Sequence, residues 1–141
     1  MSGISDLSIL LASMEPRLSP MEVVFCSFQD VGIEERLFLA PIGFFVEAEG
    51  ISLIVQRSIA EENGIPFSCV LRAITLDVHS SLAAVGLTAA VASRLALNGI
   101  SASVVAAYYH DHVFVPAPDA ERALEVLQIL QAEASGRART A

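Results

Sequence analysis

The stretch "FSCVLRAITLDVHSSLAAVGLTAA", Phe67–Ala90, decides the fold, because it passes from the periodicity of a strand to that of a helix. Its first part, residues 67–78, places apolar residues on both faces, which predicts a strand in the middle of a sheet. Ser80 or Ser81 can then cap a helix, and the apolar helical pattern that follows runs until Gly99. We therefore predict a central strand that leads into a long helix.

The residues after Gly99 predict two further strands and a second helix. Ile100–Tyr109 and His112–Pro116 are rich in β-branched and aromatic residues and flank a turn. Residues 119–134 have the spacing of an amphipathic helix. Its predicted inner stripe consists of Ala120, Leu124, Leu127 and Leu130. The second half of the chain is thus predicted to run strand, helix, strand, strand, helix.

Residues 1–65 show a weaker version of the same order. We predict a helix at about residues 5–13, a strand at 22–30, two strands around Ala48-Glu49-Gly50, and a short helix that Gly64 ends. The chain is therefore predicted to be an α+β protein of two tandem units, 1–65 and 66–134, with antiparallel sheets covered by helices on one face. Residues 135–141 are expected to be a disordered tail.

Composition excludes several classes of partner. The 141 residues include 16 acidic and 8 basic ones, for a net charge of −8, so we expect no binding to nucleic acid. The longest apolar stretch, Leu82–Ser93, is too short to span a membrane, so no membrane partner is expected either. Cys26 and Cys69 fit buried free thiols in a reducing cytoplasm. The hydrophobic content of 54% predicts a dense core and a homodimer or higher homo-oligomer.

The predicted topology gathers polar residues at one end of the second sheet. A strand, helix, strand crossover followed by a hairpin places the loop Asp77–Ser81 and the turn "YYHDH" at the same end. In a ferredoxin-like strand order, His112 would lie near Asp77 and all three histidines would cluster. The N-terminus of the long helix points into this region, and its free N–H groups favour an anion such as a carboxylate. Gly86, in the second predicted turn, would let a ligand or a backbone segment come close.

Three other uses of these residues are open at this point. His79, His110 and His112 could bind zinc, although the pair in the hairpin straddles a tight turn and no Cys or Glu completes the set. The apolar helix could instead serve purely structural dimerisation. His79 beside Ser80 and Ser81 suggests a nucleophile and a base, but adjacent residues rarely have that geometry and Ser81 is better explained as a helix cap. We therefore predict neither an enzyme nor a cofactor.

The motifs "VHSSLAAVGLTAA", Val78–Ala90, and "VAAYYHDHVFVP", Val105–Pro116, resemble those of bacterial tandem ACT-domain proteins of uncharacterised function. The resemblance extends to "LLASMEP" and "EGISLIV" in the first half. The chain is more distantly similar to the ACT regions of lysine-sensitive aspartokinases and of eukaryotic arginine sensors. The resemblance implies two ferredoxin-like ACT units of the βαββαβ type. It also implies a regulatory module that binds an amino acid where units or subunits join.

The resemblance also implies which residues contact the ligand. By position these are Ser80, Ser81, Ala84, Val85, Gly86, Ala107, Tyr108 and Asp111. Asp111 would accept a hydrogen bond from the amine or side-chain cation of the ligand, and the amides near Ser81 and Val85 would hold its carboxylate. The arginine sensors have a Glu where this chain has Ala84, so arginine itself is not the expected ligand.

Overall fold

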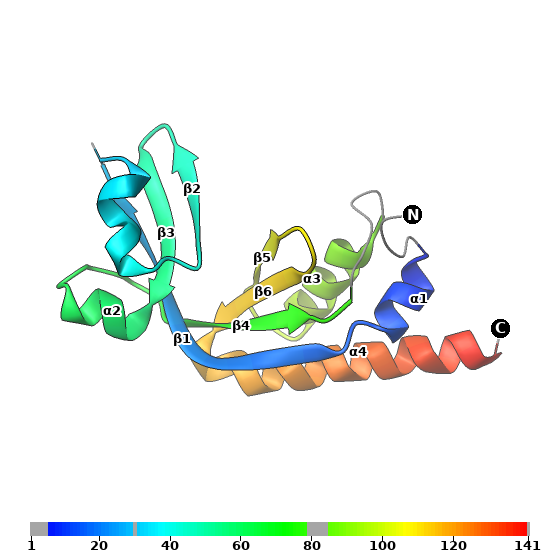
Figure 1. The fold of residues 1–141 in the computed structure, drawn as a ribbon. Helices are drawn as coiled ribbons and strands as arrows, with labels where there is room; N and C mark the ends of the chain where they lie inside the picture. The colour runs from blue at the N-terminus through cyan, green and yellow to red at the C-terminus, as the bar shows by residue number, and fades with distance from the viewer. Residues whose placement is uncertain (1–5, 30, 79–84, 141) are drawn as a thin grey trace. The chain divides into compact units, whose positions relative to one another are not determined.

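The structure is a computed structural model that describes residues 6–29, 31–78 and 85–140. The chain forms two compact units (Figure 1). Residues 20–71 make up one of them, which we call the inner unit. Residues 1–19 and 72–141 together make up the other, which we call the terminal unit. No helix among the described residues is both long and apolar enough to cross a bilayer.

The inner unit is a three-stranded antiparallel sheet with helices on one face. Its elements are the second part of β1 (Pro16–Phe28), the 3-10 helix η1 (Ile33–Leu39), β2 (Gly43–Glu47), β3 (Gly50–Gln56) and α2 (Arg57–Glu62). The strand order is β2-β3-β1, with Phe45 opposite Ser52 and Cys26 opposite Leu53. Leu39 of η1 and Ala60 of α2 are buried against the same face of the sheet. The core of this unit consists of Val24, Cys26, Leu39, Ile51, Leu53, Val55 and Ala60.

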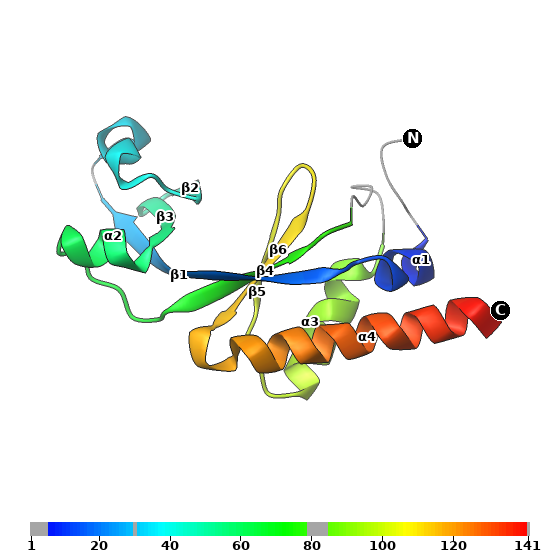
Figure 2. The same cartoon turned by 60° about the horizontal axis from the view of Figure 1, so that its bottom comes forward.

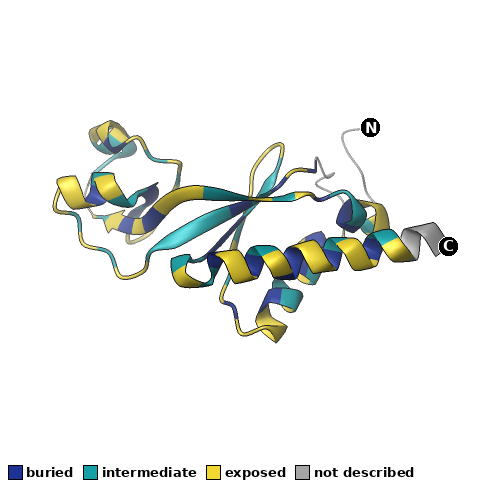
Figure 3. Cartoon of the chain, turned by 90° about the horizontal axis from the view of Figure 1, so that it is seen from below, coloured by how far each residue is buried: buried dark blue, intermediate teal, exposed yellow. Residues whose placement is uncertain are grey.

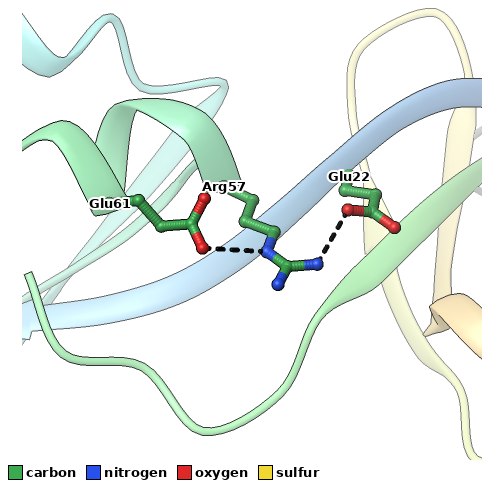
Figure 4. Close-up of polar contacts among 3 residues, drawn as sticks. All are labelled: Glu22, Arg57 and Glu61. Carbon is green, nitrogen blue, oxygen red and sulfur yellow. Dashed lines mark hydrogen bonds and ion pairs between the residues drawn. The ribbon is translucent and has the colours of Figure 1, made fainter.

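A small number of polar contacts link α2 to the strand beside it. Arg57 lies between Glu22 of β1 and Glu61 one turn further along α2, at N···O distances of 3.0 and 3.3 Å (Figure 4). All three side chains are exposed, so solvent screens these ion pairs and they stabilise the fold little. The apolar core therefore contributes most of the stability of the inner unit.

In the terminal unit, three helices pack on one face of the strands. It contains α1 (Leu7–Ala12), β4 (Leu71–Leu76), α3 (Leu87–Leu97), β5 (Ser103–Ala106), β6 (Asp111–Pro116), the 3-10 turn η2 (Ala117–Asp119) and α4 (Ala120–Thr140). The strand order is β4-β6-β5, with the first residues of β1 beside β4 (Figure 2). Arg72 donates a hydrogen bond from Nε to the carbonyl of Ser19 at 2.9 Å.

The core of the terminal unit joins the two ends of the chain. Leu10 and Met14, in and just after α1, are fully buried with Ile74 of β4 and Leu127 of α4. Helix α4 shows a continuous buried stripe along the side that faces the sheet (Figure 3). Gln131 of α4 donates from its side-chain amide to the carbonyl of Ala12 at 2.9 Å. The N-terminal helix is thus an integral part of this unit.

The α+β class, the antiparallel sheets and the helices on one face are confirmed. The compact units are composed differently from the tandem segments 1–65 and 66–134, because α1 packs against α3 and α4, and the division into these segments stays a prediction. The tail expected to be disordered from residue 135 is helical through Thr140, since Ala134 is still buried and only Gly136 in this stretch disfavours a helix. The strand predicted from Phe67 begins only at Leu71.

The long helix also begins later than predicted. Gly86 was expected in its second turn but is its N-cap residue, and α3 starts at Leu87. Gly86 has a φ of +100°, a conformation that a helix interior cannot accommodate and that other residues rarely adopt. The predicted caps Ser80 and Ser81 lie outside the described residues.

Candidate functional site

Two segments distant in sequence meet at one end of the terminal unit. Asp77 follows β4, and His110 closes the turn between β5 and β6. The imidazole Nε2 of His110 lies 3.4 Å from Oδ1 of Asp77, and a guanidinium nitrogen of Arg17 lies 3.5 Å from the same oxygen. The groups are partly solvated, so the contacts stabilise the fold only slightly. They nevertheless show that the hairpin turn lies beside the exit of β4, as the predicted strand order requires.

Asp111 and His112 lie on opposite faces of the sheet. Asp111 begins β6 opposite Ala106. Side chains alternate along a strand, and Val113 and Val115 are buried in the core beneath the helices. Asp111 therefore lies on the helix-bearing face and His112 on the other. There, Nδ1 of His112 is 2.9 Å from Oγ1 of Thr75. His112 was predicted near Asp77; it bonds Thr75, two positions before Asp77, and His110 makes the direct contact with Asp77.

Partial burial controls the ionisation of both side chains. Desolvation raises the pKa of Asp111, although the nearby His112 and His110 act to lower it. No described residue donates a hydrogen bond to its carboxylate. Desolvation lowers the pKa of His112, and the charges of His110 and Arg17 act in the same direction, while Asp111 opposes them. The end of the sheet thus holds a half-buried carboxylate with unused acceptor capacity and a neutral imidazole.

The lowered pKa of His112 predicts how stability depends on pH. The unfolded chain binds a proton at this histidine near pH 6.5, whereas the folded chain does so only at lower pH. The contribution of His112 to stability is therefore fully present above about pH 6.5 and is lost as the pH falls through the folded pKa. We expect His112→Gln to reduce the loss of the free energy of unfolding between pH 7 and pH 5, as measured by urea unfolding.

Thr75→Val is the matched control for this prediction. It removes the hydrogen bond to Nδ1 but keeps the half-buried imidazole, so the pH dependence should remain. A His112→Gln variant whose stability falls with acidification as steeply as that of the unsubstituted protein would refute the assignment of this dependence to His112.

The start of α3 is the second part of the predicted site. Gly86 takes the left-handed conformation at the N-cap, and a Cβ added there would lie 3.1 Å from a methyl group of Leu7 in α1. Val85 is 83% exposed. The N–H groups of the first turn that follow Gly86 have no intrahelical partner and can donate to an anion. The remaining predicted residues of this segment, Ser80, Ser81 and Ala84, lie outside the described residues.

The hairpin tip supplies the other predicted contacts. The amide of Ala107 donates to the carbonyl of His110 at 3.0 Å, which closes the turn. Tyr108 is 75% exposed and packs edge to face against Tyr109, with 4.9 Å between ring centroids. The structure thus brings Ala107 and Tyr108 to the same turn as Asp111.

The zinc alternative receives no support from the residues that the structure covers. In the ranges 6–29, 31–78 and 85–140, no group of three His, Cys, Asp or Glu side chains is arranged to hold a metal ion. The rings of His110 and His112 are 6.5 Å apart and contact different partners. His79 lies outside the described residues, so the three-histidine site stays a prediction.

Sequence reasoning missed three residues at this end of the terminal unit. Arg17 approaches Asp77, Thr75 bonds His112, and Leu7 covers the start of α3. Arg17 and Leu7 precede their contacts Asp77 and Gly86 by 60 and 79 positions, and no local pattern connects them. The alternation of β4 could have identified Thr75, because it lies between the buried Ile74 and Leu76.

These groups have the chemistry that binding of a small zwitterion would require. A half-buried carboxylate can accept hydrogen bonds from an ammonium group, and backbone N–H groups at the start of a helix can donate to a carboxylate. The aromatic rings at the hairpin tip can cover an apolar side chain.

Two family models match the chain, one after the other. Both describe an ACT domain, and they cover residues 2–72 and 68–128. This confirms the resemblance and the tandem order of two ferredoxin-like units. No curated protein sequence matches the chain significantly.

Solved structures share the architecture. A Vibrio cholerae protein of unknown function, described as a possible transport protein, is 45% identical and has a TM-score of 0.82, with 92% of this chain and 99% of that chain covered. The ligand-free regulatory subunit of aspartate kinase from Thermus thermophilus has a TM-score of 0.62 over 84% of this chain and 97% of its own, at 14% identity. An Agrobacterium tumefaciens protein has a TM-score of 0.58 over 82% and 87%, at 16% identity. The two less similar structures show the fold alone.

Proposed function

Because the chain belongs to the ACT-domain family, we propose that it is a regulatory module that binds an amino acid or a similar small ligand and has no catalytic activity of its own. ACT domains generally bind small molecules for regulation. The single observation that carries the proposal is the contact between Asp77 and His110. It brings the turn that holds Asp111 to the end of β4, from which the chain continues to α3.

The proposed ligand lies on the helix-bearing face of the terminal unit. Asp111 accepts a hydrogen bond from its amino group, and its raised pKa reflects a desolvated carboxylate that gains most from a cationic partner. The amides around Val85 and Gly86 bind its carboxylate. Ala107 and Tyr108 border the proposed site from the hairpin, and Ser80, Ser81 and Ala84 complete it.

Asp111→Asn tests this assignment. A charge-assisted hydrogen bond is worth about 1.5–3 kcal/mol, so the substitution should weaken binding roughly 10- to 100-fold. The measurement is isothermal titration calorimetry, after a screen of the twenty amino acids by thermal shift. A screen in which no amino acid produces heat or a shift at millimolar concentration would contradict the proposal.

Asp119→Asn is the matched control. Asp119 lies in the same unit but follows the far end of β6, where it pairs with Arg122 at 3.3 Å. Its replacement should leave affinity unchanged.

Without ligand, Asp111→Asn should be at least as stable at neutral pH as the unsubstituted protein. The raised pKa means that the stability contributed by Asp111 is present below its unfolded pKa of about 3.8 and is lost as the pH rises through the folded value.

We further propose that the module works in the cytoplasm as a homo-oligomer. A regulatory ligand can act through assembly when it binds one assembly state better than another. Sedimentation with and without the amino acid found by the screen measures this coupling directly.

A further inference from the structure

The inner unit contains a hollow on its surface that the proposed amino-acid site does not use. Its volume is about 390 Å³, which is within the range of small-molecule binding sites. The lining comes from β1, β3 and the segment between α2 and β4, and it includes Phe25, Ser27, Ser52, Pro66, Phe67 and Ser68. All of these residues belong to the inner unit, so the hollow is a feature of that unit alone.

The strand register places two hydroxyl groups in this hollow, on the face of the strands that carries no helix. Ser27 of β1 is directly opposite Ser52 of β3. The neighbouring pair, Cys26 and Leu53, belongs to the core that η1 and α2 cover. Because side chains alternate along a strand, the two serines lie on the opposite face. Phe25 is two positions from Ser27 on that same face and is 41% exposed, so an aromatic ring lies beside the hydroxyls.

The segment between α2 and β4 forms a wall of the hollow and is anchored to the core of the inner unit. The amide of Ile65 donates to the carbonyl of Ala60 at 2.9 Å, where α2 has ended. The side chains of Ile65, Phe67 and Val70 pack against the buried residues of this unit. Phe67 is therefore held in place where it lines the hollow. A site that is formed before its ligand arrives loses less entropy on binding.

A carboxylate gives the hollow a preference for cations. The Ser52 hydroxyl donates a hydrogen bond to the carboxylate of Glu47 on β2, which brings a negative charge next to the hollow. With its proton directed to Glu47, the Ser52 oxygen is left as an acceptor for a ligand. No Lys, Arg or His occurs among the described residues that line the hollow. Aromatic rings such as those of Phe25 and Phe67 also attract cations to their faces. The lining therefore favours an ammonium group over a carboxylate.

We propose that this hollow is a second binding site, and that its ligand is a small aromatic amine. The ammonium group binds the Glu47 carboxylate and the Ser52 oxygen, and the aromatic ring lies against Phe25 and Phe67. This site goes beyond the proposed function, because Asp111 lies in the terminal unit and the aromatic amine needs no carboxylate of its own. Either site can therefore bind its ligand even if the other does not.

Three probes that share one aromatic ring test the preference for charge. At neutral pH benzylamine is a cation, benzyl alcohol is neutral and benzoate is an anion. In NMR titrations of the full chain, benzylamine should bind at least ~10-fold more tightly than benzoate, with benzyl alcohol between them. The amide signals of Ser27, Ser52 and Ser68 should shift during the benzylamine titration. Equal affinities for the amine and the acid, no binding of any probe at millimolar concentration, or shifts confined to the terminal unit would overturn the proposal.

Glu47→Gln tests the contact with the ammonium group. The amide oxygen can still accept the hydrogen bond from Ser52, but the charge is lost. Benzylamine should therefore bind at least ~5-fold more weakly, while the affinity for benzyl alcohol stays the same. Glu62→Gln is the matched control, because it makes the same change of net charge on α2, which covers the other face of the strands. It should leave both affinities unchanged, and an equal effect of the two variants would refute the role of Glu47.

Phe25→Leu tests the contact with the aromatic ring. The substitution keeps an apolar side chain but removes the ring, so both benzylamine and benzyl alcohol should bind at least ~3-fold more weakly. Phe38→Leu is its control, because Phe38 is 65% exposed on η1 and lies outside the hollow. Circular dichroism shows whether each variant is folded. Asp111→Asn should leave benzylamine binding unchanged, which separates this site from the proposed amino-acid site. Unchanged benzylamine affinity in both the Glu47 and the Phe25 variants would overturn the assignment.

Discussion

Replacing Gly50 with alanine is expected to destabilise the inner unit by about 3 kcal/mol or more. Gly50 begins β3 with a φ of +146°, a region that residues with a Cβ rarely adopt. A Cβ at this position would lie 2.3 Å from the carbonyl oxygen of Phe28. Phe28 pairs with Ile51 in the same sheet, so its carbonyl cannot retreat without disturbing the pairing of β1 with β3. Urea unfolding followed by circular dichroism measures the loss.

Gly64→Ala separates the steric clash from backbone strain. Gly64 has a φ of +64°, and beyond its chain neighbours no atom of the described residues lies within 4 Å of the position that a methyl group would take there. Its replacement should cost only about 1–2 kcal/mol, the penalty of the left-handed conformation. If the two substitutions cost the same, the close approach of Gly50 to Phe28 contributes nothing to stability.

Leu10→Ala is expected to cost the terminal unit about 2–5 kcal/mol. Leu10 is fully buried among residues of β4, α3 and α4. Native-state hydrogen exchange should therefore show lost protection in β4 and β6, while the amides of β3 in the inner unit keep theirs. Ile9→Ala is the control on the same helix, because Ile9 is half exposed and its removal should cost less than about 1 kcal/mol.

The hydrogen exchange of the Leu10→Ala variant also distinguishes the tandem division of the chain from the division into inner and terminal units. If residues 1–65 folded as one cooperative unit, Leu10→Ala would reduce the protection of β3 as much as that of β4. The packing of α1 against α4 predicts the opposite.

Local patterns predicted most elements because side-chain periodicity depends on the element itself. The stripe of α4 around Leu127 and the hairpin around Asp111 followed directly from helical and alternating spacing. The sequence placed His112 near Asp77 but did not indicate that His110 makes the direct contact. Both histidines are adjacent to Asp111 in the sequence, and sequence alone does not define where the turn ends.

Other features depend on packing partners that no local pattern specifies. The apolar spacing of Leu10 and Met14 indicated burial, but it carried no information on which sheet buries them. Gly86 lay within an apolar run, where a glycine in a helix and a glycine at its start look alike. The approach of Arg17 to Asp77 follows from the placement of α1 and β1 in the terminal unit, so it could not be predicted without the tertiary fold.

The sharing of the terminal unit between both ends of the chain has a consequence for biosynthesis. During synthesis α1 emerges well before its partners in α4, because the bond from Gln131 to Ala12 spans 119 positions. The inner unit, whose strand pairs are all closer in sequence, can fold while the remainder is still being translated. During that interval the side chains of Leu10 and Met14 lack the residues of α4 that bury them in the native core. We expect nascent chains arrested before α4 to bind chaperones through this N-terminal segment, and released chains to lose that interaction.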